Sequence, residues 1–405
     1  MSVAGIAVAA RVLTLVETPK HSINVGARAH ASRQSVRNPC ATLSPIVIQP
    51  CRGLRSIFVA LSGASVFASA CRRLRAAGFR SRRVQAQSAE NGAKSDNLAL
   101  VFVKPHACTP AVLSLVPEFF RQHGVVLAGE ASIDASVIDK EGIIDSHYDT
   151  IARVGMATDI GMLRLGDEEA ERFFVGYETT LSEAIAAGEV YTAATALDAL
   201  HVSPTELLNR CLAAGYEKLR SGLYCAKLET PDGNAAYVLN GFYARMREKF
   251  VAFGVVVHCF LVRFDENELP WSSFRNNIIG ATQPKDAIAG SLRAKIRDEW
   301  QELGLKEATN YQDNGVHASA GPLEALRERM IWLRQDATTD PFGEALLALL
   351  REHMIWHVEG GDFVDELVGN PIVECDGFRA AAFDLTEDVD TAMALDMLAR
   401  CKIVG

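Results

Sequence analysis

Apolar runs and amphipathic stretches alternate along the chain from residue 97 onward. The run Asn97–Val103 is short, β-branched and apolar, which predicts a buried strand, and Pro110–His123 has apolar residues at helical spacing. Gly124–Ala128 predicts another strand, and Gly254–Phe264 predicts a strong one. This alternation of strands and helices favours an α+β fold or an α/β sandwich.

Two further segments have a mostly helical pattern. Residues 149–239 are rich in Ala and Glu, and the pair Ser203-Pro204 is typical of a helix start, with Ser as the N-cap and Pro in the first turn. The tail, residues 336–405, holds shorter helical patterns at Pro341–Trp356 and Asp388–Cys401. We therefore expect both segments to be helical.

The charge of the chain is divided unequally. The whole chain has a net charge of -9, but residues 1–90 carry 13 basic and two acidic residues, so residues 91–405 carry a net charge of -20. An acidic body argues against broad nucleic-acid binding, which needs a basic face, and we expect no specific nucleic-acid partner. The hydrophobic content of 49% excludes a disordered chain.

Residues 1–95 are interpreted as an organellar targeting leader and linker without ordered structure. Their wealth of Ala, Ser, Val and Arg and their lack of acid are typical of transit peptides. Arg83–Ala86 resembles a plastid processing site, which favours a plastid over a mitochondrion and cleavage near Ala86. The alternatives are a disordered basic arm and a membrane anchor at Ile57–Ala70. With 14 residues that run is short for a span, so we expect no stable anchor.

Several common motifs are missing from the sequence. It contains no GxxxxGK[ST] loop, which excludes a P-loop enzyme, and no GxGxxG, HExxH or GxSxG motif. The six cysteines after residue 90 stand singly, without a CxxC pair or a Cys/His cluster at metal-ligand spacing. This pattern indicates reduced, mostly buried thiols and no metal bound by the protein itself.

Side chains suited to phosphate chemistry gather between residues 274 and 330, with one more at the end of the first predicted strand. Lys104, Thr282 and Arg293 are donors for phosphate oxygens; arginine can make a planar, two-pronged contact, and lysine acts as a point charge. Asn314 is a neutral donor and acceptor that suits a ribose hydroxyl.

His317 is the candidate nucleophile. It lies three residues after Asn314 in a short β-like stretch and is followed by the small residues Ala318 and Ser319. Glu328 lies one to two turns into the next helix, from where its carboxylate can fold back and hold one imidazole nitrogen. The other nitrogen is then free to attack, as in other activated nucleophiles.

These residues resemble the motifs of the nucleoside diphosphate kinases. Gly280–Pro284 matches the family's Gly-x-Thr-Asn-Pro, Gly290–Arg293 its Gly-Thr-Ile-Arg, and Asn314–Ser319 its active-site Asn-x-x-His-Gly-Ser. Three shorter matches are Val103-Lys104-Pro105 for Ile-Lys-Pro of the first strand, His147-Tyr148 for a His-Tyr pair, and Phe242-Tyr243 for the aromatic pair that stacks on the base.

The resemblance implies a ferredoxin-like antiparallel sheet flanked by helices, formed by the split domain 96–148 plus 240–335. Residues 149–239 are then a helical insertion over the nucleotide cleft, and residues 336–405 a helical C-terminal extension. It also implies a ping-pong reaction, in which Mg²⁺-bound ATP phosphorylates a histidine that passes the phosphoryl group to a nucleoside diphosphate. Nucleoside di- and triphosphates are therefore the expected partners, with ATP as donor.

The implied roles follow the motif positions. His317 carries the phosphoryl group, Ser319 and Glu328 support it from behind, and Asn314 contacts the sugar. The remaining expected nucleotide contacts are Lys104, Thr282 and Arg293 on the phosphates, Arg275 as a shifted phosphate contact, Tyr148 near the transferred group, and Phe242 or Tyr243 on the base.

The sequence also departs from the family pattern. His106 replaces an Asp, Asn276 stands where an Arg is expected, and Ala318 and Ala320 replace Gly and an acidic residue. The long link from Arg293 to Asn314 alters a region of subunit contact, so a homo-oligomer remains open while the usual hexamer is doubtful. Two alternatives to the kinase stay open: a non-catalytic nucleotide-binding or interaction module, and a phosphohistidine donor to proteins.

Overall fold

The computed structural model describes residues 96–352 and 360–404. The expectations for residues 1–95, namely the leader, the anchor at Ile57–Ala70 and the cleavage near Ala86, lie outside the described residues. Within the described residues, the structure contains no helix with the length and apolar character needed to cross a membrane.

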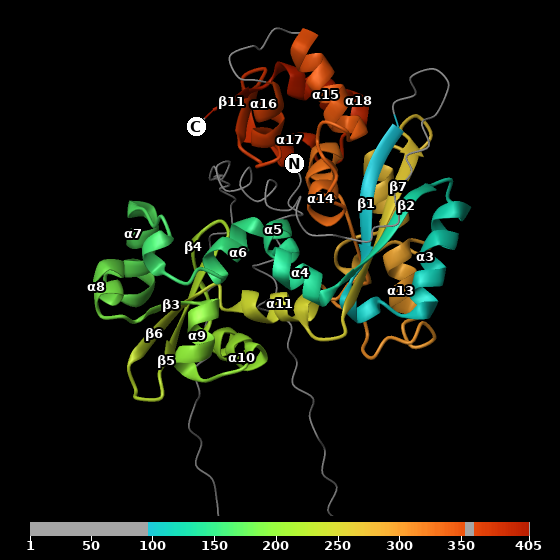
Figure 1. Ribbon diagram of the computed structural model, residues 1–405. Helices are drawn as coiled ribbons and strands as arrows, with labels where there is room; N and C mark the ends of the chain where they lie inside the picture. Colours follow the sequence, from blue (N-terminus) through green and yellow to red (C-terminus); the bar gives the residue numbers. More distant parts are fainter. Residues whose placement is uncertain (1–95, 353–359, 405) are drawn as a thin grey trace, which may run out of the picture.

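A four-stranded antiparallel sheet forms the centre of the molecule (Figure 1). Its order is β2-β7-β1-β8, with strands β1 (Asp96–Val103), β2 (Val126–Asp134), β7 (Val256–Asp265) and β8 (Val316–Ala318). With α3 (Pro110–Gln122) after β1 and α13 (Leu292–Asp298) before β8, the β-α-β-β-α-β connection and this strand order are those of a ferredoxin-like fold. The predicted α+β class, an antiparallel sheet flanked by helices, is confirmed.

Strand β1 reads as a continuous apolar run because both of its faces are buried. Ala99, Val101 and Val103 pack with α3 and α13 in one core. Leu100 and Phe102 pack in a second core on the opposite face. That second core is completed by four neighbouring helices, which are α4 (Ala135–Glu141), α5 (Ile143–His147), α11 (Phe242–Val251) and α14 (Pro322–Trp332).

Residues 149–239 form a mixed unit rather than the helical insertion that we expected. The unit has a four-stranded sheet of order β3-β6-β5-β4, in which β3 and β6 are parallel and the other pairs antiparallel. Its strands are β3 (Val190–Thr192), β4 (Glu217–Arg220), β5 (Leu223–Glu229) and β6 (Ala235–Leu239), and its helices are α6 (Asp149–Gly155), α7 (Asp167–Tyr177), α8 (Leu181–Ala186), α9 (Ala193–Leu200) and α10 (Pro204–Ala214).

The cause of this error is visible in β5. Four successive residues from Leu223 to Ala226 are buried, so the first half of the strand lacks the alternation that marks a strand with one solvent face. A Pro-Asp-Gly turn follows, where Thr230 donates its backbone N–H to Asn234 and Gly233 has φ +81°. The predicted helix start at Ser203 does occur, since its side chain accepts from the backbone N–H of Glu206 at 3.2 Å.

The C-terminal extension is also mixed, which corrects the second helical prediction. In the part of the extension that the structure describes, a three-stranded sheet of order β10-β9-β11 accompanies four helices. Asp376 and Gly377 join β9 to β10 with positive φ, which is the geometry of a tight hairpin turn. The elements are β9 (Ile372–Cys375), β10 (Phe378–Ala381), β11 (Lys402–Ile403), α15 (Pro341–Glu352), α16 (Gly360–Leu367), α17 (Ala382–Thr386) and α18 (Thr391–Arg400).

The extension is fixed to the central domain through α14, which lies between β1 and the C-terminal elements (Figure 1). Leu323 and Leu326 of α14 are fully buried in the core of the extension. Arg329 and Asp340 form a fully buried two-pronged ion pair, with N–O distances of 2.6 and 2.8 Å. The side chain of Asp390 accepts from the Trp271 backbone and from an amide at the start of β1, both at 2.6 Å.

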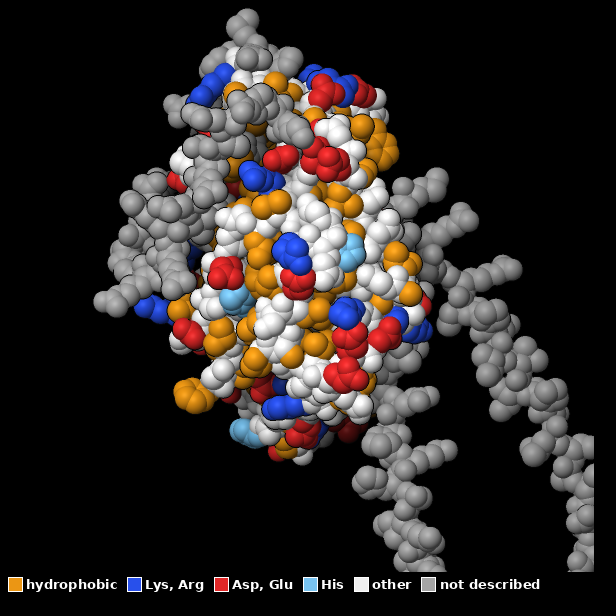
Figure 2. Space-filling view, turned by 90° about the vertical axis from the view of Figure 1, so that its right-hand side faces the viewer, with side chains coloured by type: hydrophobic (Ala, Val, Ile, Leu, Met, Phe, Trp, Pro, Cys, Tyr) orange, Lys and Arg blue, Asp and Glu red, His pale blue; other side chains and the backbone are white. Residues whose placement is uncertain are grey.

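The face of the molecule that lies to the right in Figure 1 carries mixed charge. Figure 2 shows Lys and Arg side chains standing singly among Asp and Glu side chains, with apolar side chains between them. On the described residues of this face, opposite charges are therefore interspersed.

Candidate active site

A cleft of about 1150 Å³ lies where the central domain, the insertion and the extension meet. The central domain supplies most of its wall, Ile151 and Leu208 come from the insertion, and Phe383 and Glu387 come from the extension. Eight of the predicted site residues line this cleft: Lys104, Tyr148, Phe242, Arg275, Thr282, Arg293, Asn314 and His317.

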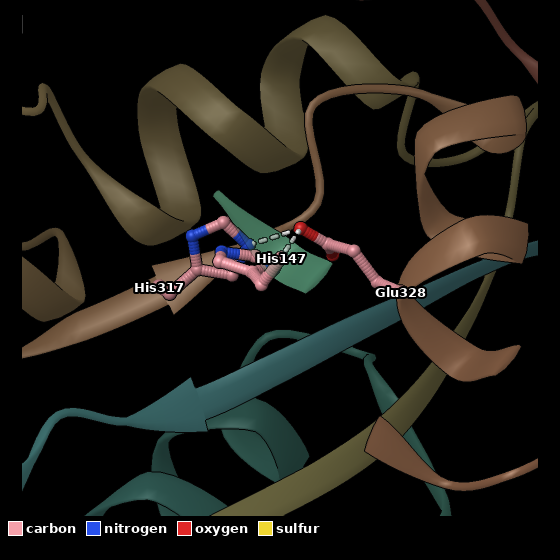
Figure 3. A group of neighbouring side chains, drawn as sticks. All are labelled: His147, His317 and Glu328. Carbon is pink, nitrogen blue, oxygen red and sulfur yellow. Dashed lines mark hydrogen bonds and ion pairs between the residues drawn. The ribbon is translucent and has the colours of Figure 1, made fainter. Parts of the chain in front are cut away.

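His317 lies on β8, opposite Phe102 of β1. Its ring stacks on the Phe102 ring with the centroids 4.6 Å apart, which fixes the plane of the imidazole. Its Nε2 atom is 2.5 Å from Oε1 of Glu328 (Figure 3). If Nε2 donates its proton to the carboxylate, Nδ1 keeps its lone pair and is the nitrogen available for attack.

Glu328 is held as a carboxylate behind His317. It is 2% exposed, and its second oxygen accepts from the Ser319 hydroxyl at 2.5 Å. The Ser319 oxygen itself accepts from the backbone N–H of Leu100 at 3.0 Å, which anchors the pair to β1. Burial alone would raise the pKa of Glu328, but the charge and hydrogen bond of His317 outweigh it and hold that pKa below its ordinary value.

His147 belongs to this group, although it was not among the predicted site residues. Its ring centroid lies 4.8 Å from that of His317, and its Nδ1 lies 3.7 Å from the same Glu328 oxygen (Figure 3). The indole N–H of Trp332 donates to that Nδ1 at 3.3 Å. Burial, with a smaller contribution from His317, lowers the pKa of His147 to about 3, so the ring stays neutral.

The three side chains have the composition of a zinc site, with ligand atoms within 4.8 Å of one another. The ring nitrogens that lie nearest Glu328 already make hydrogen bonds, however. Nε2 of His317 faces the Glu328 carboxylate, and Nδ1 of His147 accepts from Trp332. The group therefore fits a hydrogen-bonded support for His317 better than a metal centre.

Lys104 and Arg293 are two of the cations that line the cleft. Lys104 follows β1, and its ammonium donates to the Gln312 carbonyl at 2.8 Å. Burial, then the nearby Arg293, lowers the pKa of Lys104 to about 7. Arg293 is 8% exposed, and burial followed by the charge of Arg275 lowers its pKa to about 10.

Arg293 also shapes the backbone around the nucleophile. Its guanidinium donates to the Val316 carbonyl at 2.9 and 3.2 Å and to the Gly280 carbonyl at 2.8 Å. Val316 directly precedes His317 on β8. The guanidinium has five N–H groups, so these three bonds leave two for a ligand.

Asn314 has an acceptor that is not satisfied within the protein. Its amide N–H donates to the Thr282 carbonyl at 2.8 Å, which joins two of the predicted site segments. Its Oδ1 is buried and has no hydrogen-bond partner among the described residues. A buried acceptor of this kind costs free energy until a donor reaches it, and a hydroxyl of a ligand would provide one.

The structure separates the two members of the predicted aromatic pair. Phe242 lines the cleft and contacts the edges of Tyr216 and Tyr224. Tyr243 is fully buried, and its hydroxyl donates to Asp145 at 2.7 Å. The prediction that Tyr243 can stack on a base is therefore corrected, because consecutive helical residues point about 100° apart.

Arg275 lines the cleft but already holds two acids of the extension. Its Nη1 donates to Glu387 at 2.9 Å and to Asp388 at 2.7 Å. A phosphate oxygen would therefore have to compete with these two carboxylates for Arg275, which was expected as a substitute phosphate contact. Asn276, where an arginine was expected, donates its side-chain amide to the Ser272 carbonyl.

Three residues near Lys104 were missed by sequence reasoning. His106 accepts the backbone N–H of Gly315 at 3.1 Å, and its other ring nitrogen lies 3.6 Å from Asp313. Lys249 binds the same carboxylate at 2.8 Å. The departure of His106 from the family pattern was a signal that could have found it, whereas Asp313 and Lys249 belong to no motif.

No family model and no curated protein matches the chain. Among solved structures it is similar to a nucleoside diphosphate kinase from Encephalitozoon cuniculi, with 14% identity, a TM-score of 0.29, and coverage of 60% of this chain and 92% of that chain. A nucleoside diphosphate kinase from Aquifex aeolicus has 15% identity, a TM-score of 0.26, and coverage of 58% and 94%. At such values the contacts of the cleft remain the basis for assigning a function.

Proposed function

We propose that the chain is a phosphotransferase that moves the terminal phosphoryl group of ATP to nucleoside diphosphates through a phosphohistidine at His317. The observation that carries this proposal is the buried chain from His317 through Glu328 to Ser319, which orients the imidazole at the wall of a cleft. A merely structural histidine needs no buried carboxylate at 2.5 Å behind it.

In the first half of the reaction, Nδ1 of His317 attacks the terminal phosphorus of ATP. A nitrogen–phosphorus bond forms, the bond to the bridging oxygen breaks, and ADP leaves. Glu328 stabilises the positive charge that develops on the ring. In the second half, a terminal oxygen of a nucleoside diphosphate attacks the phosphohistidine and restores His317. Little further covalent help is needed, because such transfers depend mainly on alignment and on neutralised oxygens.

The other cleft residues would then bind the nucleotide. Lys104 and the two remaining N–H groups of Arg293 suit phosphate oxygens, and the Oδ1 of Asn314 suits a ribose hydroxyl. Phe242 offers a ring face that tolerates any base. Mg²⁺ would enter on the nucleotide phosphates, where it neutralises charge, and we assign no side chain to it.

Two further roles remain as alternatives. The pairing of Arg275 with Glu387 and Asp388 favours a non-catalytic nucleotide-binding module, because it removes a cation from the phosphate end. A phosphohistidine donor to proteins would keep His317 but need another acceptor. The expected plastid location and a homo-oligomer stay predictions.

A single-turnover experiment distinguishes these roles. The protein is incubated with γ-labelled ATP and Mg²⁺, separated from nucleotide, and tested for acid-labile, base-stable label. GDP is then added. Label that forms and passes to GDP supports the proposal, whereas label that stays on the protein favours a protein-phosphate donor. Binding of ATP without labelling favours the non-catalytic module. His317→Asn is the control and should abolish the label while keeping nucleotide binding.

A further inference from the structure

The C-terminal extension reaches into the phosphate end of the cleft. Glu387 and Asp388 follow α17, and both carboxylates accept from the same nitrogen of Arg275. Glu387 lines the cleft together with Arg275 and His317. The two acids and the arginine have side-chain exposures of 16%, 31% and 20%, so the pairs are partly shielded from water and from screening by salt.

These pairs change the charge that a phosphate group meets. Arg275 lies close enough to Arg293 for its charge to lower the pKa of that residue. A free Arg275 would therefore add a second guanidinium beside Arg293. With Glu387 and Asp388 bound to it, the three groups together carry a net charge of -1, and a phosphate oxygen must displace a carboxylate to reach Nη1.

Attachment of the extension does not depend on these pairs. The buried ion pair of Arg329 with Asp340, the apolar contacts of Leu323 and the bonds of Asp390 hold it in place elsewhere. The pairs of Arg275 lie in the cleft itself, where their effect falls on a bound ligand.

We propose that Glu387 and Asp388 determine specificity by holding Arg275, so that the cleft binds nucleoside triphosphates less tightly relative to diphosphates than an unpaired Arg275 would allow. This inference rests on the proposed nucleotide site. The third phosphate group adds negative charge at the end of the nucleotide that approaches His317, so it is the group most affected by a carboxylate pair on Arg275.

The test compares the affinities of ADP and of an ATP analogue with a β,γ-imido bridge, which resists transfer. Calorimetry is done on the full chain, on the variant Glu387→Gln/Asp388→Asn, and on both single variants. Release of Arg275 allows one new charge-assisted hydrogen bond, so the triphosphate-to-diphosphate affinity ratio should rise about tenfold in the double variant. In an Arg275→Ala background the same two substitutions should leave the ratio unchanged.

Asp390→Asn is the matched control, because it weakens attachment of the extension without touching Arg275. It should change the ratio less than about twofold while lowering the thermal unfolding temperature. An unchanged ratio in both single variants and the double variant would overturn the inference. So would an equal rise in the Asp390→Asn variant or in the Arg275→Ala background. If neither nucleotide binds to the wild-type chain or to any variant, the proposed function fails and this inference fails with it.

Discussion

The substitution Glu328→Gln tests the support of His317, because it removes a charge while keeping the shape of the side chain. The amide oxygen can still accept from Nε2 of His317, and the amide nitrogen can face the Ser319 hydroxyl. That hydroxyl can then turn toward the Leu100 carbonyl, which lies 3.1 Å away. The ring should therefore keep its orientation and lose only the negative charge behind it.

The size of the effect follows from the hydrogen bond that changes. A hydrogen bond to a charged group contributes about 1.5–3 kcal/mol and a neutral one about 0.5–1.5 kcal/mol. The difference of about 1–1.5 kcal/mol applies to the transition state, in which the ring becomes positive, and corresponds to a phosphorylation rate about tenfold lower. Glu328→Ala should lower the phosphorylation rate further, because it also removes the partner that orients the ring.

The rate is measured by rapid-quench labelling of the protein with γ-labelled ATP in a single turnover. Glu344→Gln is the control, since it removes an exposed acid on α15 that is not among the described residues lining the cleft. Labelling of Glu328→Gln within a factor of about two of the wild-type rate, in a protein that unfolds normally, would refute a catalytic role for this carboxylate.

Further predictions concern the rest of the cleft and the attachment of the extension. Because Lys104 has a pKa lowered to about 7, its protonated share falls as pH rises, and ADP affinity should fall through about pH 7 relative to Lys104→Arg, as titration calorimetry at several pH values would measure. Asp340→Asn leaves Arg329 buried without its charged partner and should lower the free energy of unfolding, measured in urea, by about 3–5 kcal/mol. Tyr243→Phe should lower the free energy of unfolding by about 1 kcal/mol without changing the KM for nucleotide. Phe242→Ala, in contrast, should raise the KM for nucleotide.

Each of these predictions has a contrary result. Parallel pH curves for the wild type and Lys104→Arg would mean that Lys104 does not titrate in the cleft. An unchanged urea midpoint for Asp340→Asn would mean that the ion pair contributes nothing net. A raised KM for Tyr243→Phe would return the base contact to Tyr243.

The part of the site that could be predicted from the sequence is the part formed by close neighbours in the chain. His317, Ser319 and Glu328 lie within one strand, one turn and one helix, so their spacing alone brings the carboxylate back to the imidazole. Lys104 is also predictable, because it directly follows β1, the strand that pairs with β8. Such local geometry depends little on the rest of the fold.

The features that were missed depend on distant segments. The acids that hold Arg275 lie 112 and 113 positions away, in a segment with no motif. The two members of the Phe242-Tyr243 pair look equivalent in sequence, and only the packing of α11 decides that Phe242 faces the cleft. The sheet within residues 149–239 was missed because the first four residues of β5 are all buried, so that half of the strand has no alternating pattern.

Helix α14 determines whether the extension can be separated from the central domain. The helix is embedded on nearly every side: Ala325 packs in one core of the central domain, Trp332 in the other, and Leu323 in the core of the extension. Residue 335 is therefore not a suitable domain boundary, because truncation there would expose the buried leucines of α14 to solvent. Removal of the extension would therefore require polar residues in place of Leu323 and Leu326, on the same helix that carries Glu328.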